Sequence, residues 1–186
     1  MDNYALADNF LLLAKLIDIH GDDSFKAKSY SSAAYTIEKL PVQLSSLSTT
    51  KIYAIKGVGQ AIGKKITEQM ETGRLAMLDE YINRTPQGIF DLLKIKGLGL
   101  KKISVIWKEL GIESIGELLY ACEENRLLLY KGFGAKTQQN IEESIRFYMA
   151  SQGSYLYRQI EEYAPAFTKK LQTAFSFKYI FNYRRF

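Results

Sequence analysis

The sequence predicts an all-α protein made of repeated helical units. Apolar residues recur at three- and four-residue steps along almost the whole chain, which is the spacing of helices that pack through one face. Three times a lysine precedes two glycines that flank one apolar residue, and a further apolar stripe follows. Alternation at every second residue is weak and confined to FSFKYIFNY near the C-terminus. We therefore predict helices over residues 1–170 and leave a short C-terminal strand open.

Two helices are expected before the first glycine pair. Their apolar stripes are Leu6, Phe10, Leu13 and Ile17 in the first helix, and Phe25, Ala33 and Ile37 in the second. Ser24 is the expected N-cap of the second helix, and Pro41 is expected to end it. His20 lies near the end of the first helix, where we expect a surface group.

The glycine pairs define an internal repeat. They are Gly57-Val58-Gly59, Gly97-Leu98-Gly99 and Gly132-Phe133-Gly134. The stripes that follow them are Ile62, Ile66 and Met70; Ile103, Ile106, Trp107 and Leu110; and Ile141, Ile145 and Met149. A repeat of this kind indicates stacked units of helix, short turn and helix.

The segment NRTPQG at residues 83–88 interrupts the helical pattern and is the best candidate for a domain boundary. A softer boundary is SQGS at residues 151–154. The predicted division is therefore residues 1–83 with the first unit, residues 84–150 with two units, and residues 151–186.

Charge and composition limit the function classes. The net charge is +5, and residues 51–65 and 94–108 contain lysines but no acid, which indicates a polyanionic partner. One histidine and one cysteine exclude a His/Cys zinc cage and an intrachain disulfide. No apolar run is long enough for a membrane span, and the N-terminus is acidic. We expect a cytoplasmic protein, with Cys122 packed on a helix face.

The glycine turns have the features of a phosphate-binding device. Glycines permit a sharp turn and close approach of another backbone, and the next helix presents unpaired N–H groups and a positive dipole end. The middle residues Val58, Leu98 and Phe133 are expected to point inward. Two alternatives are a plain tight turn, which three matched copies disfavour, and a dinucleotide fold. The latter requires a preceding strand, and Gly63 falls one residue late for it.

The chain resembles the N-terminal part of bacterial X-family DNA polymerases, the group related to DNA polymerase beta. The resemblance rests on FKAKSYSSAAYTIEKLP, IKGVGQAIGKKITEQMETGRL, LLKIKGLGLKKISVIWKELGIESIGEL and YKGFGAKTQQNIEESI. It identifies the repeats as helix-hairpin-helix motifs. It implies a small lyase-type domain at residues 1–83, a DNA-gripping domain at 84–150 and a truncated start of the palm at 151–186.

The resemblance also implies individual roles. Lys65 matches the lysine that forms a Schiff base with the sugar of an incised abasic site. Tyr30 matches a tyrosine near that lysine and the phosphate, with a possible supporting role. Two alternatives for Lys65 stay open: it neutralises a phosphate, or it is only a solvated charge. Phe25 takes the place of a histidine that stacks on a base. For Phe25 and for Tyr30, packing in the core is the alternative role. Ala61 and Ser31 replace basic residues of the family. The predicted DNA-binding residues are Lys26, Lys28, Lys56, Gly57, Gly59, Lys64, Lys96, Gly97, Gly99, Lys101, Lys102, Gly132, Gly134 and Lys136.

Cofactor expectations follow from the same resemblance. Binding itself should require no cofactor, but Na⁺ or K⁺ is expected at the first two hairpins. The matching backbone carbonyls belong to Tyr53, Ile55 and Val58, and to Leu93, Ile95 and Leu98. Divalent ions would belong only to the palm.

Three function classes remain open. The first is sequence-independent binding of gapped or nicked DNA in repair, by a monomer with no membrane or small-molecule cofactor. The second is a 5′-deoxyribose-phosphate lyase that uses Lys65, and the third is a protein-interaction scaffold. The catalytic aspartates of the family palm do not occur, since the last aspartate is Asp91. We therefore expect a fragment or natural truncation that does not polymerise DNA, whatever its parent does.

Overall fold

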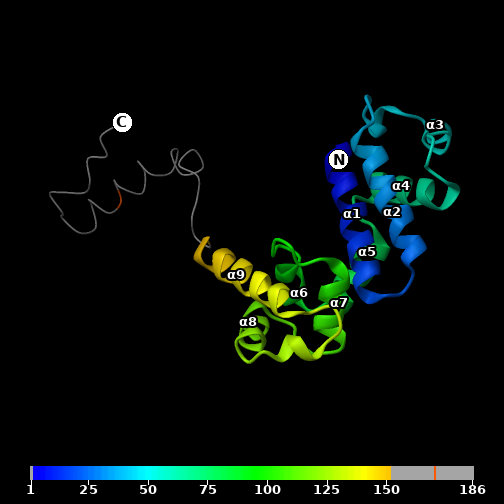
Figure 1. The fold of residues 1–186 in the computed structure, drawn as a ribbon. Coiled ribbons are helices and arrows are strands. Elements are labelled where there is room, and N and C mark those ends of the chain that lie inside the picture. Colours follow the sequence, from blue (N-terminus) through cyan, green and yellow to red (C-terminus); the bar gives the residue numbers. More distant parts are fainter. Residues whose placement is uncertain (1, 152–169, 171–186) are drawn as a thin grey trace. The chain divides into compact units, whose positions relative to one another are not determined.

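The computed structural model describes residues 2–151 and residue 170, and these residues form helices and turns without a strand (Figure 1). The all-α prediction is confirmed. The expected C-terminal strand and palm segment lie outside the described residues, apart from Ser151 and Lys170. In chain order the helices are α1 (Asn3–His20), α2 (Ser24–Glu38), η1 (Leu44–Ser46), α3 (Thr49–Tyr53), α4 (Gln60–Thr72), α5 (Ala76–Arg84), α6 (Gln87–Leu92), α7 (Leu100–Lys108), α8 (Ile115–Glu123), η2 (Arg126–Leu129) and α9 (Ala135–Ser151).

Residues 1–146 form one compact unit, and residues 147–186 form a second. Every contact discussed below lies within the first unit. The predicted boundary between residues 83 and 84 falls one residue before α5 ends. None of the helices in the described part of the chain combines the length and the apolar character that a membrane span requires.

Aspartate side chains begin the first two helices. The Asp2 carboxylate accepts a hydrogen bond from the Ala5 N–H at 2.8 Å, and Gly21, the C-cap of α1, has a left-handed φ of 71°. Asp23 accepts from the N–H groups of Phe25 and Lys26, both at 2.9 Å. The prediction of Ser24 as the cap of α2 is therefore wrong by one residue. Asp23 has the extended backbone that lets its carboxylate reach the free N–H groups of the first turn.

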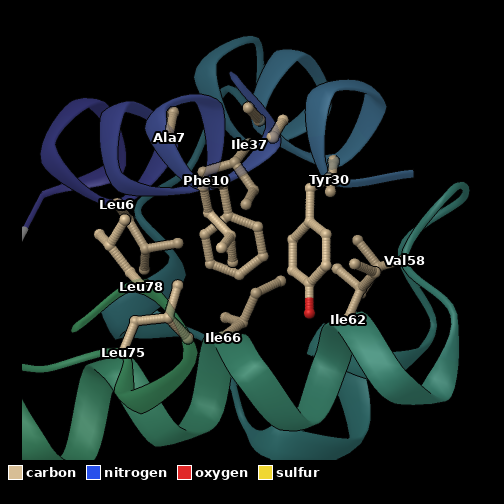
Figure 2. Close-up of a cluster of buried hydrophobic side chains, with 14 of the residues drawn as sticks. Leu6, Ala7, Phe10, Tyr30, Ile37, Val58, Ile62, Ile66, Leu75 and Leu78 are labelled. Atoms are coloured by element: carbon tan, nitrogen blue, oxygen red, sulfur yellow. The ribbon is translucent and has the colours of Figure 1, made fainter. Parts of the chain in front are cut away.

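The core of the N-terminal half forms between the α1–α2 pair and the helices that follow (Figure 2). Phe10 of α1 and Tyr30 of α2 place their ring centroids 5.6 Å apart, and Ile66 of α4 packs below them. The stripe predicted for α1 is confirmed, since its four members are at most 1% exposed. Burial of each large apolar side chain contributes about 1.5–3 kcal/mol to folding. Phe25 does not join this core, because its side chain is 80% exposed.

Close backbone contact joins α6 to the start of α8. A Cβ atom added to Gly88 of α6 would lie 2.0 Å from the Glu113 carbonyl oxygen, so only glycine fits there. Glu113 precedes the α8 N-cap, where Ser114 and Glu117 form a capping box. The position of α6, which begins the second hairpin unit, therefore depends on a glycine outside the hairpin itself.

The C-terminal end of α1 contacts α7, the second helix of the second hairpin. Ser104 Oγ donates a hydrogen bond to the Ile19 carbonyl at 2.7 Å, and Lys108 Nζ donates to the His20 carbonyl. These bonds satisfy carbonyl groups that a helix end leaves without a partner. The His20 ring makes edge-to-face contacts with Tyr81 and Trp107 at centroid distances of 5.2 and 4.9 Å. The prediction of a surface His20 is wrong: the residue is 7% exposed.

Candidate nucleic-acid interface

The three glycine turns share one backbone geometry. In each turn the N–H of the middle residue donates to the carbonyl three residues earlier, from Val58 to Ile55 at 2.9 Å, from Leu98 to Ile95 at 3.2 Å and from Phe133 to Tyr130 at 3.2 Å. The first carbonyl of each following helix belongs to the second glycine, and it accepts from Gly63, Ile103 and Gln138. The element before the turn is a short α-helix in the first two units and the 3-10 helix η2 in the third. The predicted repeat is thus confirmed at the level of the backbone.

The two glycines of a pair have different roles. The first glycine is left-handed in every turn, with φ of 91° at Gly57, 82° at Gly97 and 93° at Gly132, and glycine adopts this conformation without strain. The second glycine has an ordinary φ at Gly59 and Gly99, close to −72°. A Cβ added to Gly59 or to Gly99 would meet nothing within 4 Å. The backbone conformation therefore does not require a glycine at the second position. The missing side chain instead leaves the surface of the turn open.

That open surface lies over helix N-termini that no side chain caps. Gly59 is the N-cap of α4 and Gly99 the N-cap of α7, and neither helix has a side-chain capping bond. By contrast, α1, α2 and α8 are capped by Asp2, Asp23 and Ser114. The first N–H groups of α4 and α7 are consequently available to an external acceptor such as a phosphate.

The middle residues point into the protein, as predicted. Val58 is 4% exposed, Leu98 7% and Phe133 3%. Val58 joins the core of the N-terminal half, and Figure 2 shows it beside Ile62 and Tyr30. Burial of the middle side chain leaves the peptide groups of the turn as its outer surface.

Most of the predicted DNA-binding lysines are exposed. They are Lys26, Lys28, Lys56, Lys64, Lys96, Lys101 and Lys136, whereas Lys102 is half-buried. Among the described residues, no carboxylate oxygen lies within 4 Å of any of these eight ammonium groups. Their charge is therefore not neutralised within this part of the molecule.

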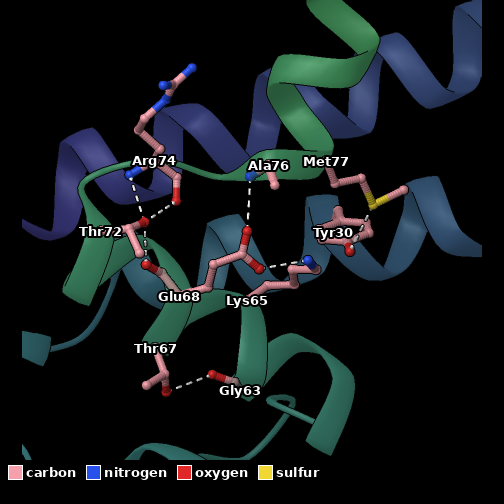
Figure 3. A network of polar contacts seen from close by, with 9 residues as sticks. All are labelled: Tyr30, Gly63, Lys65, Thr67, Glu68, Thr72, Arg74, Ala76 and Met77. Atoms are coloured by element: carbon pink, nitrogen blue, oxygen red, sulfur yellow. Dashed lines mark hydrogen bonds and ion pairs between the residues drawn. The ribbon is translucent and has the colours of Figure 1, made fainter.

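Lys65 differs from these lysines because it is paired (Figure 3). Its Nζ donates to Glu68 Oε2 at 2.6 Å, and its side chain is 30% exposed. The other Glu68 oxygen accepts from the Ala76 N–H at 2.9 Å, at the start of α5. The hydrogen bond from Lys65, followed by that from Ala76, holds the Glu68 pKa below its usual value. The prediction did not include Glu68, although its i+3 spacing from Lys65 was a visible signal.

Tyr30 lies beside this pair but makes a different bond. Its hydroxyl donates to Met77 Sδ at 3.4 Å, and the ring is 5% exposed (Figure 3). Burial raises the Tyr30 pKa, and the nearby Lys65 charge opposes that rise. Tyr30 is thus a core residue at the edge of the candidate site, and it does not donate to Lys65.

Phe25 and the first hairpin line a shared pocket of about 650 Å³. The pocket also contains Lys28, whose Nζ lies 5.9 Å from the Phe25 ring centroid. Gly57 and Gly59 also line it. An exposed ring beside lysines and open glycine backbone is a suitable surface for a nucleotide. The pocket brings together residues that the sequence placed about 30 positions apart, but Lys65 is not among its lining residues.

The second hairpin contributes to another groove, of about 290 Å³, with α9. Lys96, Gly97 and Lys102 line one side. Polar residues of α9, Thr137, Asn140 and Ser144, line the other. Sequence reasoning missed these three, although their three- and four-residue spacing marks one helix face.

Comparison with known proteins identifies the class of fold. A family model described as a helix-hairpin-helix domain matches residues 1–75, and one described as a SAM-like helix-hairpin-helix tandem matches residues 89–146. The described unit is therefore a helix-hairpin-helix protein. The chain is also 30% identical, over 133 residues, to the DNA polymerase/3'-5' exonuclease PolX of Bacillus subtilis (strain 168). That match covers 72% of this chain and 23% of the relative. The predicted resemblance to the X-family DNA polymerases is therefore confirmed, with two helix-hairpin-helix regions and one similar polymerase.

Proposed function

We propose that this chain binds gapped or nicked DNA through its phosphate backbone, without regard to base sequence, in a DNA-repair context. The observation that carries the proposal is the repeated turn geometry, with uncapped N–H groups beneath open glycine surface at Gly59 and Gly99. A helix N-terminus of this kind favours an anion through its N–H groups and its dipole.

The proposed contacts do not distinguish one base from another. Backbone N–H groups and unpaired lysines bind phosphate oxygens, which are the same at every base pair. Turns on separate helices can bind the strands on either side of an interruption. The lysines supply long-range attraction that depends on salt, because phosphate binding releases counterions.

We propose Na⁺ or K⁺ as a bridge between hairpin carbonyls and a phosphate. The Ile55 and Ile95 carbonyls each accept one hydrogen bond within the turn, and a carbonyl oxygen retains a second lone pair. The equivalent geometry of the two turns is compatible with a cation at both. The ligands would be the carbonyls of Tyr53, Ile55 and Val58, and those of Leu93, Ile95 and Leu98. A bound cation would supply positive charge facing the phosphate.

The test is a salt series of DNA-binding measurements on the wild type, Gly59→Val, Gly99→Val and Gly116→Val. The wild-type affinity should fall steeply with salt, with a logarithmic slope of about −0.9 for each phosphate neutralised. Each hairpin variant should bind roughly tenfold more weakly, which corresponds to the loss of about one charge-assisted hydrogen bond.

Gly116→Val is the matched control, because Gly116 is exposed on α8, outside the hairpins, and its added side chain also meets open space. Circular dichroism checks that all variants fold. Folded hairpin variants with wild-type affinity would contradict the phosphate-binding proposal. Intact, nicked and gapped duplexes in the same assay measure the preferred DNA structure.

We propose 5′-deoxyribose-phosphate lyase activity as a second function. The observation that favours it is the position of Lys65 beside Tyr30, since Tyr30 lines the Phe25 pocket. In the reaction the Lys65 ammonium would first lose a proton to solvent. The neutral amine would then add to the sugar aldehyde, take up one proton and release water to give an iminium. Loss of a proton from the adjacent carbon would then expel the phosphate. The Lys65–Glu68 ion pair has to open before this attack.

Borohydride trapping with a labelled, incised abasic-site duplex tests the lyase proposal. A covalent adduct should form with the wild type and with Lys64→Ala, and disappear with Lys65→Ala. Glu68→Gln should increase the adduct, because it removes the carboxylate that holds Lys65. Salt-sensitive DNA binding without any adduct would contradict lyase activity and leave the binding proposal intact.

The chain spans 23% of the length of the polymerase that it resembles. We propose that this polypeptide acts as a monomer in the cytoplasm. Size-exclusion chromatography with light scattering, with and without DNA, tests the oligomeric state.

A further inference from the structure

A groove of about 430 Å³ runs between α1, α2 and the first turn of α7. Three lysines from three helices converge on it: Lys15 of α1, Lys28 of α2 and Lys101 of α7. No carboxylate among the described residues lies within 4 Å of these ammonium groups. Asp18 also lines the groove and is its acidic member. The groove therefore has a basic rim with one opposing charge.

The groove shares Lys28 with the first-hairpin pocket and is lined by residues next to the second glycine pair. Lys28 lines both this groove and the pocket that contains Phe25 and the first glycine pair. Leu100 and Lys101 are the first two residues of α7, directly after the second glycine pair. A strand held at the first and second hairpins would therefore have a route across this groove.

Apolar side chains also line the groove, beside Ser24 and Ser31. They are Leu11, which is 38% exposed, alanines of α1 and α2, and Leu100. A duplex presents phosphates outward and keeps its base faces stacked inside, so it gains nothing from such an apolar lining. A single strand offers both phosphates and free base faces, and the combination of a basic rim with an apolar surface is suited to it.

We infer that this groove binds the single-stranded template segment exposed in a DNA gap, between the sites held by the first and second hairpins. The inference rests on the proposed DNA binding and adds Lys15 to the interface. Lys15 and Lys101 neutralise template phosphates, and Asp18 opposes them. Phe25, which lines the neighbouring pocket together with Lys28, is available to stack on a base.

The experiment compares wild type, Lys15→Met, Asp18→Asn and Lys39→Met on two labelled duplexes. One duplex has a nick, and the other has a gap of about five nucleotides, within the range that one single-strand site covers. Met keeps the apolar stem of lysine and removes its charge. Lys39 is the matched control, since it lies beyond the C-terminal end of α2 and pairs with Glu38.

Lys15→Met should weaken binding to gapped DNA several-fold and reduce its logarithmic salt slope by about 0.7, the single-strand value. Binding to nicked DNA should not change. Asp18→Asn should strengthen gapped binding, and Lys39→Met should change neither. Equal losses on both duplexes, or no loss with Lys15→Met, would overturn the groove inference while wild-type binding still supports the proposed function. Wild type without salt-sensitive binding to either duplex would overturn both.

Discussion

His20 is the residue whose chemistry changes most between sequence and structure. Thr85 Oγ1 donates its hydrogen to the Tyr81 carbonyl at 2.7 Å, and His20 Nε2 lies 2.9 Å from the same Oγ1. Because the hydroxyl has only one hydrogen to donate, His20 Nε2 must be the donor in the second bond. The arrangement fits a neutral imidazole with its hydrogen on Nε2.

Protonation of His20 is opposed by its surroundings. Burial contributes most to lowering the His20 pKa, and Arg84 and Lys108 lower it further, while Asp22 acts in the opposite direction. The folded state therefore binds a proton less readily than the unfolded chain. Stability from this source is present above the unfolded pKa of about 6.5 and is lost as the pH falls toward the lower folded pKa.

We predict that acidification from neutral pH lowers the free energy of unfolding, and that His20→Gln loses the part of this dependence that begins near pH 6.5. Gln retains a donor for Thr85 but does not titrate. Urea unfolding at a series of pH values measures the effect. The same acid dependence in both proteins would show that His20 protonation does not contribute.

Cys122 illustrates a residue whose role the sequence predicted correctly. It packs on a face of α8 with 2% exposure, and burial raises the pKa of its thiol to about 11, with a smaller contribution from Glu142. A thiol reagent reacts with the thiolate, so burial and a raised pKa both slow the reaction.

We predict that an aromatic disulfide reagent labels Cys122 quickly in urea and slowly in buffer. Rapid labelling of the native protein would contradict this packing.

At the scale of elements, Gly88 and Gly116 lie on adjacent helices with opposite surroundings. Gly88 of α6 lies against the Glu113 backbone, where no Cβ fits, whereas Gly116 of α8 faces open space. Inside a helix, alanine is otherwise favoured over glycine by about 0.5–1 kcal/mol. Sequence position alone gives no indication of this difference.

We predict that Gly88→Ala destabilises the protein by about 1–3 kcal/mol, since overpacking forces backbone shifts. Gly116→Ala should be neutral or slightly stabilising. Thermal and urea unfolding measure both variants. Equal stability of the two variants would mean that α6 and the start of α8 do not approach as closely as described.

At the scale of the whole unit, Trp107 is a natural reporter because it is the only tryptophan in the chain. It contacts His20 where α1 meets α7, and Ser104 on the same helix bonds to Ile19. These contacts connect the first hairpin region with the second. The compact unit of residues 1–146 includes both regions.

We predict that Trp107 fluorescence and far-ultraviolet circular dichroism report coincident urea transitions, as a cooperative unit requires. Ser104→Ala should lower the free energy of unfolding by about 1 kcal/mol, because the Ile19 carbonyl loses its partner. A fluorescence transition at clearly lower urea than the circular dichroism transition would indicate that the two regions unfold independently.

Local patterns in the sequence determined the helices, the three glycine turns and the inward middle residues. Helix periodicity and the left-handed requirement at Gly57, Gly97 and Gly132 depend on a few neighbouring residues, so they are visible without a fold. The resemblance to X-family DNA polymerases also followed from these motifs and their order. The Ser24 cap was wrong by one residue because Asp23 is an equally suitable capping type.

Only the tertiary structure decided which distant side chains meet. The burial of His20 depends on α5 and α7, which contribute Tyr81 and Trp107 from more than sixty residues away. The need for glycine at position 88 arises from the backbone of Glu113. The groove that joins Lys15, Lys28 and Lys101 likewise requires three helices to pack together. Such contacts result from packing between elements, which no local spacing encodes.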